Sequence, residues 1–168
     1  MLTRFRIIFL IWFVSIGASH AQGITVSKAA LDGGSTEAIL FSFTAQNRVS
    51  GVEIVRPGFV EQMNLESIRS FQGGAETPIW LTTDSVKFQK RIPHTAWIRR
   101  EGKNLRIEFA TDIAVGDKIE LGIQMSIADK SENKNTAVII RTWDRARPNS
   151  MTDHSTNALS IKERNSKN

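Results

Sequence analysis

The chain has 168 residues, which is enough for one domain and too few for two of ordinary size. Its composition, 40% hydrophobic and 23% charged, is that of a globular protein and excludes wholesale disorder. The formal net charge is +5, and cysteine is absent, which excludes disulfides, thiol catalysis and thiolate metal sites.

Residues 1–21 have the three parts of a secretory signal peptide. Arg4 and Arg6 form a positive start, an apolar run follows, and Ser19 and Ala21 are small residues at the positions that a signal peptidase reads. The apolar run is about half of the roughly 20 residues that a membrane-spanning helix requires. We therefore expect cleavage after Ala21, a mature net charge of +3, and export to the periplasm or cell envelope.

Short segments rich in β-branched and aromatic residues follow, separated by turn residues. Residues 24–26, 37–44 and 49–55 have this character, and Pro57 followed by glycine suits a tight turn after the third segment. Residues 59–71 are ambiguous, because their apolar residues fit a helix face as well as a short strand. The surrounding β pattern favours strand or irregular structure there.

The strongest alternation lies between Leu105 and Ile127. Two runs of apolar residues at every second position flank a turn at residues 114–117, which predicts two antiparallel strands with one face in a core. Residues 86–89 also alternate and are interpreted as a strand. Three mature tryptophans sit beside aliphatic residues, so we expect them in the core: Trp80, Trp97 and Trp143.

Residues 136–143 form the last predicted strand, and the sequence becomes polar after it. We expect residues 147–168 to be a disordered tail, because so few large apolar residues cannot offset the entropy of ordering. Eight to ten short strands without a convincing helix predict an all-β fold, an immunoglobulin-like antiparallel β-sandwich or a related β-barrel, over residues 22–146.

No residue pattern typical of catalysis or metal binding is present. His94 follows a proline and lacks the neighbours of a metal motif, so it is interpreted as a turn residue facing water. The acidic pairs Asp112 with Asp117 and Asp129 with Glu132 lack calcium-loop spacing. We therefore predict no catalytic residues, no metal and no cofactor.

One stretch of the chain has a local excess of positive charge. Seven cations between residues 87 and 106 accompany a single acid, Glu101, which gives this stretch a charge of +6 around Trp97. Such a strip could bind an anionic envelope polymer or a membrane surface; nucleic acid is not expected for an exported protein. The alternative is that these cations only decorate solvent-facing strand positions. The strip comprises Lys87, Lys90, Arg91, Arg99, Arg100, Lys103 and Arg106.

The segment from Leu40 to Met125 resembles a family of small exported proteins of unknown function that is common in cyanobacteria. Its most specific piece is LESIRSFQG at residues 65–73, and NLRIEFATDIAVGDKIELGIQM follows at residues 104–125. The resemblance implies a signal peptide followed by one β-sandwich domain, and it implies no catalytic residue.

These observations favour an exported, non-enzymatic binding or structural module. The competing hypothesis is an envelope glycan hydrolase, which would require a carboxylate pair brought together from separate strands. A protein partner could also pair through an exposed edge strand, and the sequence leaves the oligomeric state open.

Overall fold

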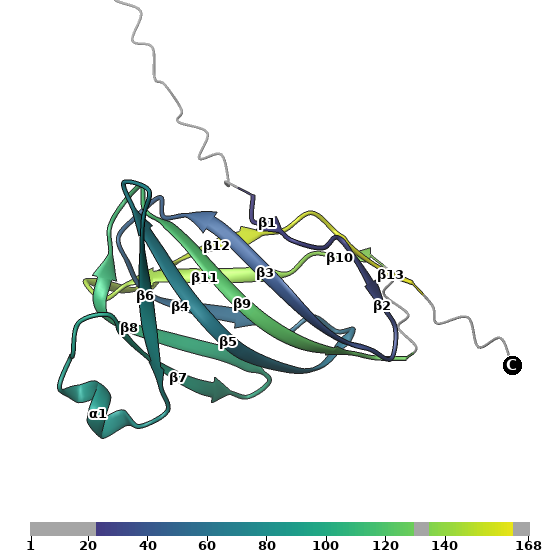
Figure 1. Cartoon of the computed structure of the whole chain (residues 1–168), viewed down its shortest axis with the longest axis horizontal. Coiled ribbons are helices and arrows are strands. Elements are labelled where there is room, and N and C mark those ends of the chain that lie inside the picture. Colours follow the sequence, from purple (N-terminus) through teal and green to yellow (C-terminus); the bar gives the residue numbers. More distant parts are fainter. Residues whose placement is uncertain (1–22, 130–134, 163–168) are drawn as a thin grey trace, which may run out of the picture.

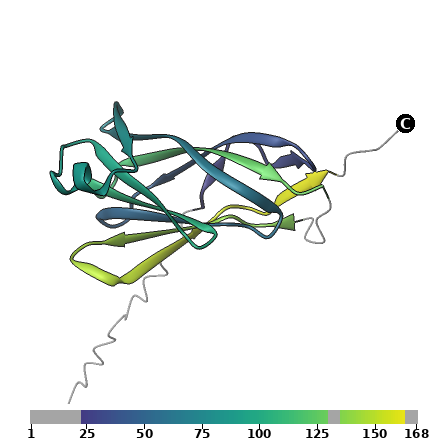
Figure 2. The ribbon, with the colours of Figure 1, turned by 90° about the horizontal axis from the view of Figure 1, so that it is seen from below.

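A computed structural model describes residues 23–129 and 135–162, and Figure 1 shows a sandwich of two strand layers around one core. Figure 2 shows the two layers from the side, with the yellow-green β11–β12 hairpin at the lower left. The structure confirms the prediction of an all-β sandwich. The predicted signal peptide lies outside the described residues.

The first layer is built on β9, which pairs antiparallel with β3 on one side and with β5 on the other. A two-residue strand, β1, pairs with the outer edge of β3. The order of the layer is β1 (Thr25–Val26), β3 (Thr36–Thr44), β9 (Lys118–Ile127) and β5 (Val60–Gln72).

The second layer is antiparallel throughout. It ends at β12, which pairs with β11 alone among the strands of the described residues. Its order is β7 (Thr95–Glu101), β8 (Asn104–Ile113), β4 (Val49–Val55), β11 (Ile139–Asp144) and β12 (Arg147–Ser155).

Strand β6 (Ala75–Thr82) joins the two layers. Its first part pairs antiparallel with β5 as far as Ile79, and its second part, from Trp80, pairs in parallel with β7. A small separate sheet, in which β13 pairs in parallel with β2, completes the fold. It contains β10 (Asn135–Thr136), β13 (Leu159–Lys162) and β2 (Ala30–Asp32).

The core follows the predicted alternation in β8 and β9. Alternate residues of both strands are at most 2% exposed, because each strand turns one face to the other layer. The two strands are not hydrogen-bonded neighbours, however: β8 pairs with β7 and β4, and β9 with β3 and β5. The buried residues of these strands include Leu105, Ile107, Phe109, Ile119, Leu121, Ile123, Met125 and Ile127.

The predicted strand at residues 86–89 is wrong. These residues form the one-turn helix α1 (Ser85–Gln89), whose first amides, Val86 N–H and Lys87 N–H, donate to the Asp84 carboxylate at 2.9 and 3.1 Å. An aspartate immediately before the first turn satisfies amides that have no partner within a helix. This cap favours a helix over a strand for residues 85–89.

The predicted disordered tail is wrong for residues 147–162, and residues 163–168 lie outside the described part. Strand β12 pairs with β11 from Trp143 opposite Met151 to Ile139 opposite Ser155, so backbone hydrogen bonds order it without many large side chains. Leu159 in β13 is fully buried. The second layer thus extends past the predicted boundary at residue 146.

Two further expectations concern residues 59–71 and the tryptophans. The ambiguous segment is a strand, β5, as favoured from its context. Trp143 is buried with 7% exposure, but it lies outside the core cluster, between Arg106 and Gly51, and Trp80 is 71% exposed, so neither belongs to the core. Trp80 lies on β6 next to the buried Ile79, so alternation turns its ring outward.

Candidate functional site

The structure divides the predicted basic strip into two groups. Arg99, Arg100 and Arg106 on β7 and β8 have partners within the protein. Arg99 lies over the Trp97 ring at 4.7 Å and 3.3 Å from the Glu108 carboxylate. Because Arg100 is the next residue in the strand, it points to the other face, where its Nη2 donates to the Met63 carbonyl at 2.8 Å.

Arg106 belongs to the packing of the outer face of the second layer. Its guanidinium lies 4.4 Å from the centre of the Trp143 ring and 3.0 Å from the Glu101 carboxylate. The indole of Trp143 in turn covers Gly51 on β4. An arginine between an aromatic face and carboxylates has its charge balanced, so Arg106 is a structural residue here.

The other four cations of the strip are exposed: Lys87, Lys90, Arg91 and Lys103. Within residues 23–129 and 135–162, no hydrogen bond or ion pair engages their side chains. Lys103 lies in the turn after β7, about 20 Å from the start of that strand at about 3.3 Å per residue. The remaining three are close together in sequence, in and just after α1.

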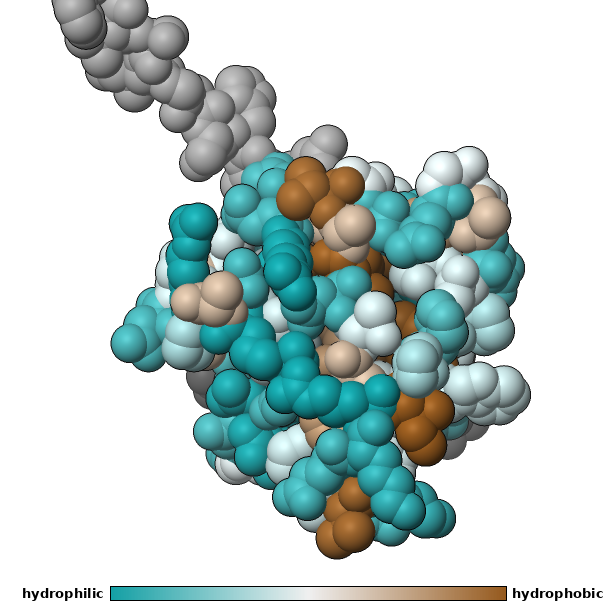
Figure 3. Space-filling model, turned by 90° about the vertical axis from the view of Figure 1, so that its left-hand side faces the viewer, coloured by the Kyte–Doolittle hydropathy of each residue, from teal (hydrophilic) through white to brown (hydrophobic). Residues whose placement is uncertain are grey.

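Exposed apolar side chains accompany these three cations. Trp80 is 71% exposed, Val86 64% and Ile92 55%, although large apolar side chains are normally buried. Figure 3 shows apolar side chains protruding between hydrophilic ones at the lower end of the molecule, over α1. We call this region the α1 surface; it consists of Trp80, Val86, Lys87, Lys90, Arg91 and Ile92.

Several contacts fix the α1 surface to the second layer. Phe88 stacks on Trp97 with ring centres 5.9 Å apart, and the Trp80 amide donates to the His94 carbonyl at 2.7 Å. The turn after the helix contains two non-glycine residues with positive φ, Arg91 at 46° and His94 at 58°. Such conformations persist where surrounding contacts hold them. The exposed side chains are therefore presented on a defined backbone.

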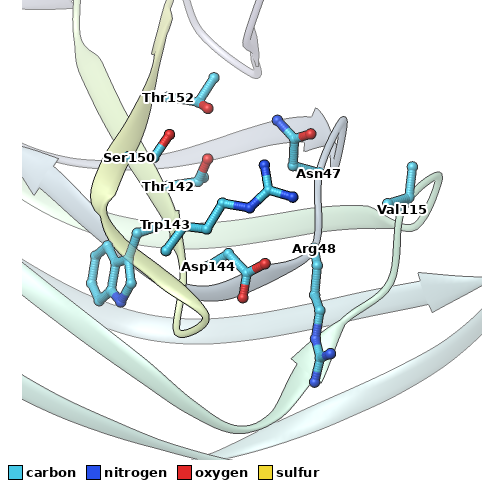
Figure 4. Close-up of a pocket in the computed structure, with 9 residues that line it drawn as sticks. Asn47, Arg48, Val115, Thr142, Trp143, Asp144, Ser150 and Thr152 are labelled. Carbon is cyan, nitrogen blue, oxygen red and sulfur yellow. The ribbon is translucent and has the colours of Figure 1, made fainter.

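A polar cavity of about 230 Å³ lies at the β11–β12 hairpin, where it meets the β3–β4 and β8–β9 connections (Figure 4). Figure 4 shows the hydroxyl groups of Thr142, Ser150 and Thr152 along this cavity, and the Arg48 side chain points away from them. Arg48 is instead 2.6 Å from the Asp112 carboxylate through its Nε. Among the residues that line this cavity, Asp144 carries the carboxylate, so the carboxylate pair of a glycosidase is not assembled here.

A second cavity, of about 400 Å³ and more apolar, opens between β5 and β7. It exists because β6 leaves β5 at Ile79 to pair with β7, so the first half of β5 and the last half of β7 have no strand between them. Its lining combines the aliphatic Leu65, Leu81, Ile98 and Leu105 with the polar Asn64, Thr82, Thr83, Arg99 and Arg100.

The other candidate residues are not brought together. His94 is exposed in the turn after α1, as expected of a residue that faces water. Asp112 lies between Arg48 and Arg145, whereas Asp117 is 9% exposed. Glu132 lies outside the described residues. Within 23–129 and 135–162, no group of three or more histidine and acidic side chains could hold a metal ion.

The free edge of β12 is the feature relevant to a partner strand. Residues 147–151 of this strand are exposed, and Pro148 removes one backbone donor from it. Proline on an edge strand hinders pairing with another chain. A protein partner at an edge strand stays a prediction.

No family model and no curated protein matches the chain. Among solved structures, it is similar to the major pilin subunit BcpA of Bacillus cereus, with 7% identity and a TM-score of 0.44 over 84% of this chain and 39% of that one. It is also similar to the collagen-binding domain of a Staphylococcus aureus adhesin, with 10% identity and a TM-score of 0.44 over 83% of this chain and 99% of that domain. The 35 kDa C-terminal fragment of the major pilin GBS80 of Streptococcus agalactiae is similar too. Its sequence identity is 10% and its TM-score is 0.46, over 83% of this chain and 55% of the fragment.

These similarities are too distant to support a functional argument. The predicted resemblance to small exported proteins of unknown function remains a prediction. In the described part of the chain, none of the helices has the length and apolar character needed to cross a bilayer.

Proposed function

We propose that the protein is an exported, non-enzymatic binding module whose α1 surface docks on an anionic membrane. One observation carries the proposal: three exposed apolar side chains lie at the same end of the sandwich as three exposed cations that have no partner among residues 23–129 and 135–162. The predicted signal peptide at residues 1–21 supports export. None of the residues of the α1 surface belongs to the core cluster.

The two kinds of side chain suit the two parts of a membrane surface. A Lys or Arg near an anionic leaflet contributes about 1 kcal/mol of attraction. Tryptophan is favoured at the boundary between headgroups and acyl chains, because its ring is apolar and its indole N–H is polar. Trp80, Val86 and Ile92 would enter this boundary while Lys87, Lys90 and Arg91 remain among the headgroups.

The apolar residues favour a membrane over a soluble anionic polymer. A polymer would pair with the cations alone, and exposed aliphatic residues such as Val86 and Ile92 would gain nothing from it. A bilayer removes their surface from water, at about 25 cal/mol per Å² of apolar area. Because Val86 on α1 and Ile92 after it are exposed, they favour a membrane over a soluble polymer as the partner.

Binding to vesicles tests the charge contribution. The triple variant K87E/K90E/R91E and the control K103E are compared by co-sedimentation with vesicles containing anionic phosphatidylglycerol. Losing about 1 kcal/mol at each of three positions predicts at least about 100-fold weaker binding for the triple variant. K103E, which changes another exposed cation in the turn at the far end of β7, should bind like the wild type. Equal losses in both variants would contradict a localised site.

The apolar contribution is tested separately. Trp80→Ala and Ile92→Ser should each weaken vesicle binding at high salt, where the electrostatic attraction is screened. Brominated acyl chains should quench Trp80 fluorescence in the wild type. If the protein binds a soluble polyanion as tightly as vesicles, and Ile92→Ser changes neither, the polymer alternative is correct and the membrane proposal is wrong.

A further inference from the structure

The cavity between β5 and β7 is a gap in the wall of the sandwich. Residues 60–67 of β5 pair with β9 alone, and residues 98–101 of β7 pair with β8 alone. Between these two stretches the interior reaches solvent through a space of about 400 Å³. This volume is within the range of about 300–1,000 Å³ that is typical of small-molecule sites.

Four of the nine residues that line this cavity are aliphatic. Leu65, Leu81 and Ile98 are half-buried and pack against the core from its margin, whereas Leu105 is 2% exposed. The three half-buried side chains come from three different strands, β5, β6 and β7, and they leave the space between them unfilled. An apolar group placed there would remove their remaining surface from water.

Arg100 supplies a positive charge to this apolar space. Its Nη2 donates to the Met63 carbonyl and to Asn64 Oδ1, both at 2.8 Å, so the side chain crosses from β7 to β5. These two contacts orient the guanidinium and use one of its three nitrogens. In the described residues no partner engages its Nε or Nη1, which leaves donors available to a ligand.

We propose that this cavity binds a single-chain amphiphile with a carboxylate head, of the fatty acid type. The alkyl chain lies against Leu65, Leu81 and Ile98, and the carboxylate accepts hydrogen bonds from the Arg100 guanidinium. Arginine and a carboxylate form short, charge-assisted hydrogen bonds that fix the orientation of the ligand. The proposal is independent of the α1 surface, since none of the residues on that surface lines the cavity.

Calorimetric titration of the full-length purified protein with dodecanoate, below its micelle concentration, tests this site. Dodecan-1-ol has the same chain without the charge and should bind about 10- to 100-fold more weakly, because it loses charge-assisted hydrogen bonds. Arg100→Gln should reduce dodecanoate affinity by a similar factor and leave dodecan-1-ol affinity unchanged. Arg147→Gln, which changes an exposed arginine outside the cavity, should have no effect.

A cavity-filling variant tests the position of the chain. Leu65→Trp should abolish binding of both compounds, whereas Val115→Trp, a matched change at a residue that is 64% exposed, should not. Far-UV circular dichroism would show whether each variant is folded. If Leu65→Trp does not fold, the effect of Arg100→Gln, a change at an exposed position, still tests the proposal.

Three outcomes overturn the proposal. If dodecanoate does not bind, the free edges of β5 and β7 would instead suit an extended peptide strand. If dodecan-1-ol binds as tightly as dodecanoate, the cavity is an apolar site without a carboxylate partner. If Arg100→Gln and Arg147→Gln weaken binding equally, the attraction is due to net charge and not to this site.

Discussion

Replacing Gly51 by alanine tests how tightly the outer face of the second layer is packed. A Cβ added at this position would overlap Cζ2 of Trp143, and it would lie 2.7 Å from the carbonyl oxygen of Ile107. The indole is held from above by Arg106, 4.4 Å from its ring centre. The side chain could rotate away only by giving up this contact, and the carbonyl belongs to β8 and cannot move without disturbing the sheet.

The expected sign follows from the magnitudes. With free space, alanine in a strand is more stable than glycine by about 0.5–1 kcal/mol, because glycine loses more conformational freedom on folding. Overpacking costs about 1–3 kcal/mol. Loss of the cation–π contact between Arg106 and Trp143 adds about 0.5–1 kcal/mol. We therefore expect Gly51→Ala to destabilise the protein by about 2 kcal/mol.

Urea unfolding measures this difference. With a slope of about 1–3 kcal/mol per molar urea, the midpoint should fall by about 1 M at an unchanged slope. Gly23→Ala is the control, because the nearest atom to its Cβ, the Ser155 carbonyl oxygen, is 4.0 Å away. This control should lie within about 0.5 kcal/mol of the wild type. A Gly51→Ala protein that is as stable as the wild type would refute the described packing of Trp143.

Three further predictions concern other parts of the fold. Gly122→Ala should destabilise the protein by about 1–3 kcal/mol through overlap with the Ser67 hydroxyl, and Ser67→Ala in the same protein should restore most of the loss, as a double-mutant cycle of urea midpoints will show. The hydrogen bond from Lys28, 2.7 Å long, lowers the pKa of Glu37 below its ordinary value of 4.5. A lowered pKa stabilises the folded state above that value, and the contribution disappears as the pH falls through the folded-state pKa, so the stability difference between wild type and Glu37→Gln should vanish in acid. Asp84→Ala should cost about 1 kcal/mol of local helix stability and accelerate trypsin cleavage within α1, whereas unchanged cleavage would mean that the cap is dispensable.

The core could be predicted because its determinants are local. Three successive alternate residues are apolar in β8 and five are apolar in β9, and this period alone assigns each of these side chains to the interior. The pairing of the strands could not be predicted in the same way. The turn at residues 114–117 suggests a hairpin, but the chain crosses from one layer to the other there, with the Gly116 amide donating to the Ala45 carbonyl at 2.8 Å.

The errors occurred where short patterns or composition were the only guide. The four residues from Val86 to Gln89 alternate as a strand would, yet one helical turn fits them equally, and the capping role of Asp84 was readable in the sequence. The polar composition of β12 suggested disorder. Its order comes from backbone pairing with β11, which composition does not report.

The candidate site was predictable in part. Counting charges along the chain found Lys87, Lys90 and Arg91, which are exposed and unpaired in the described part. It also included Arg99 and Arg100, whose partners Glu108 and Asn64 come from other strands and could not be inferred from sequence distance. The exposure of Trp80 cannot be inferred from the sequence, because its aliphatic neighbours Ile79 and Leu81 suggest burial.

The order in which strands pair has a consequence for the biogenesis of the protein. Ser160 in β13 lies beside Ala30 in β2, and Ile140 in β11 beside Ile54 in β4, so two early strands pair with strands that are synthesised much later. Folds dominated by such distant pairings form slowly, on the scale of milliseconds to seconds. A nascent chain that still lacks β11 and β13 leaves β4 and β2 without these partners, so the sandwich stays incomplete until both strands have been made.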